Sequence, residues 1–161
     1  MIAVLKGPVV GGGLEFATAA HLRVAERDGL LRPPGGRTRP VRRWRCVGTG
    51  LPRCRRAAMT DLMLTGRLLD AEESLRDGLA VYLVDSGQGL DKALEPAKQI
   101  ANNSPVINYA ILHALPRIAE TDPETGLLME SLMAAVALSS PEAKQRVNDF
   151  LTGKSTEVVQ R

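Results

Sequence analysis

Apolar and turn-forming residues alternate in the first part of the chain in a way that predicts three elements. Residues 2–5 (IAVL) favour β-structure and predict a buried strand, and residues 9–10 predict a second short strand after a Gly-Pro break. Glycines at 11–13 follow, and residues 14–27 carry apolar side chains at helical spacing. Strand, glycine turn and helix form a layout that directs backbone N–H groups at whatever lies above the turn.

Helical patterns dominate the second half of the chain. Asp70 and Glu73 have the spacing of a capping box before a short helix at 71–76, and Gly78 has the position of its C′ glycine. Apolar residues at 79–84 predict a strand. The other predicted helices span 57–64, 89–101, 104–119, 122–138 and 140–151. We therefore divide the chain into a mixed α/β part at 1–88, a helical part at 89–152 and a polar tail at 153–161.

Residues 29–56 interrupt this regularity. The stretch has neither a helical nor a strand period and is rich in Arg, Pro and Gly, so by itself it predicts a loop. From Arg32 to Arg56 there are nine Arg and no acidic residue. The whole chain has a formal net charge of +3, whereas the chain without this stretch has a net charge of −6. No nucleic-acid-binding motif accompanies the arginines, so a nucleic-acid partner is not expected.

Length and composition exclude several classes of protein. A chain of 161 residues with 44% hydrophobic residues can bury the core of one domain, which argues against global disorder. No run of 18 apolar residues is present, so no membrane span is expected. The first residues lack the features of a signal peptide, which favours a cytoplasmic location. Cys46 and Cys54 fit no metal-binding spacing, so we expect unpaired thiols and no metal site.

Two segments carry specific motifs. The first is IAVLKGPVVGGGLE at 2–15, continued by RVA at 23–25. The second comprises LTGR at 64–67, DAEE at 70–73 and GL at 78–79. Together, and in this order, they resemble the enoyl-CoA hydratase/isomerase (crotonase) family. The resemblance implies an α/β fold: a partial spiral of ββα units followed by a C-terminal helical region, in a chain that starts too late to contain the N-terminal part.

The resemblance also implies a site. In the family, two backbone N–H groups form an oxyanion hole for the thioester carbonyl of an acyl-CoA, and one of them comes from the GGG turn, which is Gly12 here. Gly11 and Gly13 would contact the substrate beside it, and Glu15 matches the first catalytic glutamate. Lys154 is a candidate for contact with a CoA phosphate. No cofactor is implied beyond the CoA thioester, which is the substrate.

The second catalytic glutamate of the family is missing from its expected place. The family has a Pro-Glu pair where this chain has Pro34-Gly35. The match stops near Asp28 and resumes near Ala57 without a change of spacing, and a one-base shift over residues 30–36 permits Tyr-Tyr-Ala-Leu-Pro-Glu-Gly. We therefore hypothesise that residues 29–56 are read out of frame, which the nucleotide sequence of the coding region would test.

The implied activity is reversible hydration of a 2-enoyl-CoA. Two alternatives stay open: enoyl-CoA isomerisation, which can use a single carboxylate, and a non-catalytic fragment that binds homologous subunits. The family further implies a homo-oligomer, either a trimer or a hexamer, to which the helical region contributes. His21 and His113 lack neighbours at metal-ligand spacing, so each is expected to be a structural or a surface residue and not a ligand.

Overall fold

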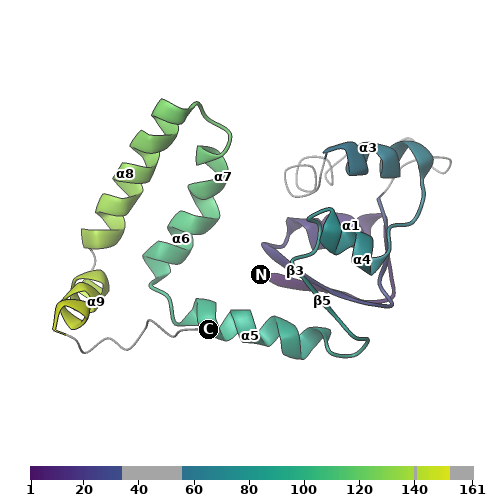
Figure 1. Ribbon diagram of the computed structural model, residues 1–161, viewed down its shortest axis with the longest axis horizontal. Coiled ribbons are helices and arrows are strands. Elements are labelled where there is room, and N and C mark those ends of the chain that lie inside the picture. Colours follow the sequence, from purple (N-terminus) through teal and green to yellow (C-terminus); the bar gives the residue numbers. More distant parts are fainter. Residues whose placement is uncertain (34–55, 140, 153–161) are drawn as a thin grey trace. The chain divides into compact units, whose positions relative to one another are not determined.

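The computed structural model describes residues 1–33, 56–139 and 141–152 (Figure 1). The chain forms two compact units, Met1–Lys98 and Gln99–Arg161. The sequence pattern placed a division after residue 88, whereas the two units divide inside the helix α5 (Gly89–Ala101). Most of α5 therefore belongs to the first unit.

Parallel strands build the first unit. β1 (Ile2–Leu5), β3 (Leu22–Glu26) and β5 (Tyr82–Val84) form a parallel sheet in the order β1-β3-β5. β2 (Pro8–Val10) and β4 (Leu30–Arg32) pair in parallel as a second sheet. Parallel pairing requires crossover connections, and in each of these pairs at least one helix lies in the chain between the two paired strands. The predicted α/β class and the strands predicted at 2–5 and 9–10 are confirmed.

The helix predicted at 14–27 is wrong in its second half. The helix α1 (Gly12–Ala19) ends before Ala20, whose backbone is extended with φ −68° and ψ 157°. β3 follows and lies between β1 and β5, so it gains hydrogen bonds on both edges together with burial, and these override helical spacing. The sequence did not predict this central strand because charged residues such as Arg23 and Glu26 are normally exposed, whereas here each residue is only 2% exposed.

The loop predicted at 29–56 is also wrong where the structure describes it. Leu30–Arg32 form β4, and Leu31 is fully buried and exchanges two backbone hydrogen bonds of 2.8 Å with Leu69. This antiparallel bridge and the pairing with β2 give the segment a strand conformation that its composition did not predict. Residues 34–55 lie outside the described residues.

The helices α1, α3 (Arg56–Thr65) and α4 (Ala71–Arg76) contribute to the core of the first unit together with the strands. Its largest buried apolar residues are Leu5, Leu14, Leu31, Met59, Leu62, Leu69 and Leu79. The predicted capping box is confirmed: Asp70 Oδ1 accepts the N–H of Glu73 at 2.7 Å, and Glu73 Oε2 accepts the N–H of Asp70 at 3.4 Å. The predicted C′ glycine, Gly78, has φ 79°.

The strand predicted at 79–84 is shorter than expected. The N–H groups of Leu79 and Ala80 both donate to the carbonyl of Ser74, at 2.9 and 3.0 Å, and so close the C-terminus of α4. β5 therefore begins only at Tyr82.

The second unit is a helical assembly, as predicted. α6 (Pro105–His113) and α7 (Leu115–Ile118) contact α8 (Pro123–Ser139), which returns alongside them, and α9 (Pro141–Leu151) contacts α8 (Figure 1). The single helix predicted at 104–119 is divided at Ala114. Pro116 explains the division because its missing N–H cannot donate to the carbonyl one turn earlier. Among the described helices, none combines the length and the apolar character needed to cross a membrane.

Candidate functional site

The glycine turn between β2 and α1 is held in a conformation that glycine alone adopts without strain. Gly11 has φ 56° and ψ −122°, and it occupies the N-cap position of α1. Its N–H donates to the carbonyl of Arg32 at the end of β4 over 3.0 Å, and its own carbonyl accepts the N–H of Glu15 over 3.1 Å. The start of α1 is therefore tied to the β2–β4 sheet.

This turn leaves backbone N–H groups available at the start of α1. The N–H groups of the first residues of a helix have no acceptor within the helix. Gly11 has no side chain with which to cap them, and both Gly12 and Gly13 are exposed. Among the described residues, no atom lies within 4 Å of a Cβ atom added to either of these two glycines. The described part of the chain therefore leaves open space at the N-terminus of α1, where uncapped N–H groups and the positive end of the helix dipole suit an oxygen that carries negative charge.

Glu15 lies in the first turn of the same helix. Its side chain is half-buried, and its carboxylate has no hydrogen-bond or ion-pair partner among the described residues. Its carbonyl accepts the hydroxyl of Thr18 at 2.9 Å, which helps to hold this turn. A carboxylate that no described residue engages, in the same turn as uncapped N–H groups, can exchange a proton with a bound molecule.

The structure thus brings together four of the residues predicted for the site: Gly11, Gly12, Gly13 and Glu15. The fifth, Lys154, lies outside the described residues, as does the Pro34-Gly35 position of the missing glutamate. Among the described residues there is no group of three His, Cys, Asp or Glu side chains that could hold a metal ion. His21 Nδ1 lies 3.0 Å from the N-terminal amine, and the ring of His113 contacts that of Tyr109 in a tilted arrangement, with centroids 4.5 Å apart and an interplanar angle of 42°.

Sequence reasoning missed the buried carboxylate of Glu26. Its two oxygens accept the N–H groups of Gly87 and Gly89, at 2.8 and 2.9 Å, so it caps the N-terminus of α5 from a neighbouring strand. A Cβ at position 89 would lie 2.6 Å from Glu26 Oε1, which explains the glycine there. The available signal was weak: Gln88, just before α5, is a poor N-cap residue, so the cap had to come from elsewhere.

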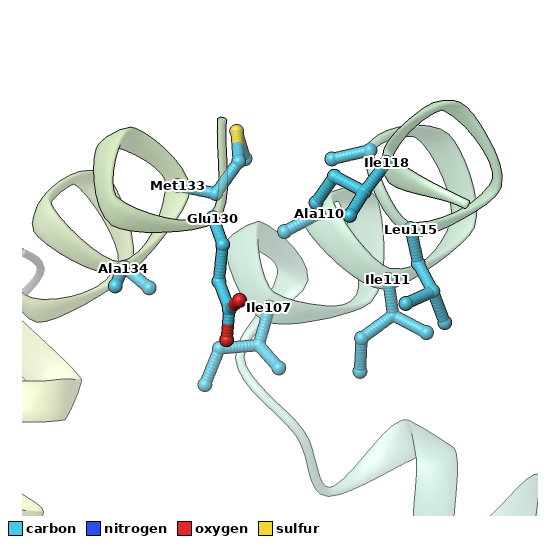
Figure 2. A pocket seen from close by; sticks show the side chains of 10 residues that line it. Ile107, Ala110, Ile111, Leu115, Ile118, Glu130, Met133 and Ala134 are labelled. Atoms are coloured by element: carbon cyan, nitrogen blue, oxygen red, sulfur yellow. The ribbon is translucent and has the colours of Figure 1, made fainter. Parts of the chain in front are cut away.

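An apolar groove of about 240 Å³ lies in the second unit between α6, α7 and α8 (Figure 2). Its lining includes Ile107, Ile111, Ile118 and Met133, and Glu130 is the one charged side chain among its described lining residues. Apart from Glu130, the side chains of these lining residues are apolar. The start of α1 combines uncapped backbone N–H groups with a carboxylate, so it is the stronger candidate for the site.

Comparison with known proteins gives consistent results. No family model matches the chain. Enoyl-CoA hydratase EchA19 of Mycobacterium tuberculosis is 36% identical over 160 residues, which cover 93% of this chain and 56% of that protein. Probable enoyl-CoA hydratase 2, a mitochondrial protein of Arabidopsis thaliana, is 34% identical over 158 residues, which cover 92% of this chain and 50% of that protein.

Solved structures agree with these relatives. A crystal structure from Rhodopseudomonas palustris, of a protein assigned to the enoyl-CoA hydratases, superposes with a TM-score of 0.86 at 49% identity. The superposition covers 98% of this chain and 61% of the Rhodopseudomonas chain. An enoyl-CoA hydratase from Mycobacterium tuberculosis superposes with a TM-score of 0.85 at 28% identity. That superposition covers 94% of this chain and 60% of the Mycobacterium chain. The chain therefore spans about half to three-fifths of the length of the proteins it matches.

Proposed function

Because the chain belongs to the enoyl-CoA hydratase/isomerase (crotonase) family, we propose that its glycine turn and Glu15 act on an acyl-CoA thioester. The observation that carries this proposal is the exposed pair of glycines at the start of α1, with a carboxylate in the same turn that no described residue engages. The substrate is a 2-enoyl-CoA, and no resident cofactor takes part.

The N–H of Gly12 donates to the thioester carbonyl oxygen in this proposal. Electron density moves onto that oxygen when water adds across the conjugated double bond, so a fixed N–H stabilises the enolate-like intermediate more than the substrate. The open space above Gly12 and Gly13 supports the assignment because a carbonyl can approach the backbone there without a steric clash.

Glu15 exchanges a proton in the same reaction. In hydration, the hydroxyl of water bonds to the β-carbon and a proton is delivered to the α-carbon, so one group must remove a proton and one must supply it. Glu15 serves for one of these transfers. The second carboxylate of the family has no counterpart at Pro34-Gly35, and this favours isomerisation as a second candidate, because one carboxylate can carry a proton between two carbons of an enoyl-CoA.

The test compares Glu15→Gln with Glu124→Gln. Glu124 is a matched control because it is an exposed glutamate in the first turn of α8, in the other unit. We expect Glu15→Gln to lower the rate of crotonyl-CoA hydration or of 3-enoyl-CoA isomerisation by about 10²–10⁴-fold, as for the loss of a general acid or base. Glu124→Gln should leave the rate unchanged. A wild-type chain that neither binds nor turns over any acyl-CoA would refute the proposal.

We further propose that the chain self-associates, as a trimer or hexamer, through its second unit. In support, α8 exposes five large apolar side chains: Leu127, Leu128, Leu132, Val136 and Leu138. Apolar side chains exposed together on one helix are typical of a surface that another protein covers. Light scattering on the purified chain should give a multiple of the monomer mass. Co-purification with a full-length homologue without turnover would instead favour the non-catalytic fragment. The cytoplasmic location stays a prediction.

A further inference from the structure

One large apolar side chain is exposed just after the first turn of α1. Phe16 is 72% exposed. It follows Gly12 by four residues and Gly13 by three, and residues at these spacings share one face of a helix. Side chains on a helix lean toward its N-terminus and cover the surface above the preceding turn. Phe16 therefore lies on the same face of α1 as the two glycines. Its ring leaves the space above them open, because a Cβ atom at either glycine would meet no described atom within 4 Å.

No other side chain of the first turns of α1 competes for this position. Leu14 and Thr18 are fully buried, and Ala17 is buried as well. Gly12 and Gly13 have no side chain, so Glu15 and Phe16 are the two side chains of this part of the helix that a molecule bound to the glycine N–H groups can meet.

These two side chains differ in chemistry. Glu15 supplies a carboxylate for proton transfer, whereas Phe16 supplies an apolar surface with no polar atom. An acyl thioester has the same division, because its carbonyl group is polar and reactive while the remainder of its acyl chain is apolar. A ligand of this class can place its carbonyl oxygen at Gly12 and cover the exposed ring with its chain.

We propose that Phe16 is a specificity-determining residue whose ring contacts the acyl chain of the thioester held at Gly12. The inference rests on the proposed function and deepens it by naming the residue that distinguishes one acyl chain from another. The contact is apolar, so it acts on the acyl chain and leaves the nucleotide part of CoA unaffected.

The experiment measures the affinity of the whole chain for free CoA, butyryl-CoA and octanoyl-CoA by calorimetric titration. The variants are Phe16→Ala and Phe16→Leu, and Phe150→Ala is the matched control because Phe150 is also an exposed aromatic, 68% exposed, on α9 of the second unit. Circular dichroism checks that each variant keeps its helices. We expect Phe16→Ala to weaken octanoyl-CoA binding by about tenfold, which is 1.4 kcal/mol. Phe16→Leu should lose less affinity for octanoyl-CoA than Phe16→Ala does. Free CoA should bind equally well to all variants.

The outcomes separate this inference from the proposal on which it rests. If wild type binds acyl-CoA and Phe16→Ala binds every acyl-CoA as tightly, the role of Phe16 is refuted and the proposed function stands. If Phe16→Ala weakens free CoA and the acyl-CoAs equally, the ring supports the fold and the inference also fails. If wild type binds free CoA but gains nothing from any acyl chain, both the inference and the proposed function fail.

Discussion

Alanine substitution at two adjacent glycines should separate stability from substrate binding. Gly11 has φ 56° and ψ −122°, a conformation in which an L-residue is strained. Gly11→Ala should therefore destabilise the first unit by roughly 1–2 kcal/mol. Gly12 has no positive φ and open space around a Cβ atom. Gly12→Ala should stabilise the chain by about 0.4–1 kcal/mol, because alanine restricts the unfolded chain without strain in the folded one.

The same methyl group at position 12 should interfere with binding. It occupies the space through which a thioester carbonyl approaches the Gly12 N–H, so that hydrogen bond lengthens or breaks. The loss of one neutral hydrogen bond weakens binding by about 2–12-fold, and the loss of an oxyanion donor lowers turnover by about 10²–10³-fold.

Two assays distinguish these effects. Urea denaturation followed by circular dichroism gives the stability of each variant, and titration with butyryl-CoA gives its affinity. The reasoning predicts that Gly12→Ala is at least as stable as wild type yet binds less tightly, whereas Gly11→Ala is less stable. If Gly12→Ala binds butyryl-CoA as tightly as wild type, the N–H of Gly12 does not hold the carbonyl.

Three further predictions concern the first unit. Glu26→Ala should lower its unfolding free energy by roughly 2–4 kcal/mol in urea denaturation, because two N–H groups at the start of α5 lose their acceptor, and Glu26→Gln should lose less. Asp70→Ala should cost about 1 kcal/mol through loss of the capping box, measured in the same way. A hydrogen bond from Arg67 holds the pKa of Glu73 below its usual value, so the resulting stabilisation is complete above the unfolded value of about 4.3 and is lost as the pH falls through the folded pKa. An NMR titration of Arg67→Gln should show a higher pKa for Glu73, and an unchanged pKa would contradict this account.

Elements with local signals were predictable from the sequence. The capping box at Asp70, the C′ glycine at position 78 and the helix at 89–101 all follow from residues close together in the chain, and each is present in the structure. β3 was not predictable in this way. Its strand conformation depends on β1 and β5, which lie far away in sequence, and its buried Arg23 donates to the carbonyls of Ala20 and Leu79. Hydrogen bonds of this kind, which offset the burial of a charge, do not appear in the spacing of apolar and polar residues along the sequence.

The candidate site shows the same distinction. Gly12 and Glu15 were selected through a family resemblance, because a glycine run and a first-turn glutamate are common features by themselves. The availability of the N–H groups at α1 depends on the backbone of Gly11 and on its hydrogen bond to Arg32, which composition could not reveal. Phe16 had no signal in the sequence, since an apolar residue in a predicted amphipathic helix is normally assigned to the core.

Restoring a second carboxylate is the sharpest remaining test of hydration against isomerisation. The hydrogen bond from Gly11 to Arg32 joins the glycine turn to the end of β4, and in sequence β4 is followed closely by Pro34-Gly35, where the family has its Pro-Glu pair. Gly35→Glu supplies a carboxylate at that position, and Gly36→Glu adds the same charge one residue later as a control. If the second carboxylate is the only group that hydration lacks, Gly35→Glu should raise the rate of crotonyl-CoA hydration by about 10²-fold or more. Gly36→Glu should leave that rate unchanged. A gain in both variants would indicate a general effect of charge. A gain in neither, with isomerisation retained and still dependent on Glu15, would mean that a single carboxylate carries the chemistry of this chain.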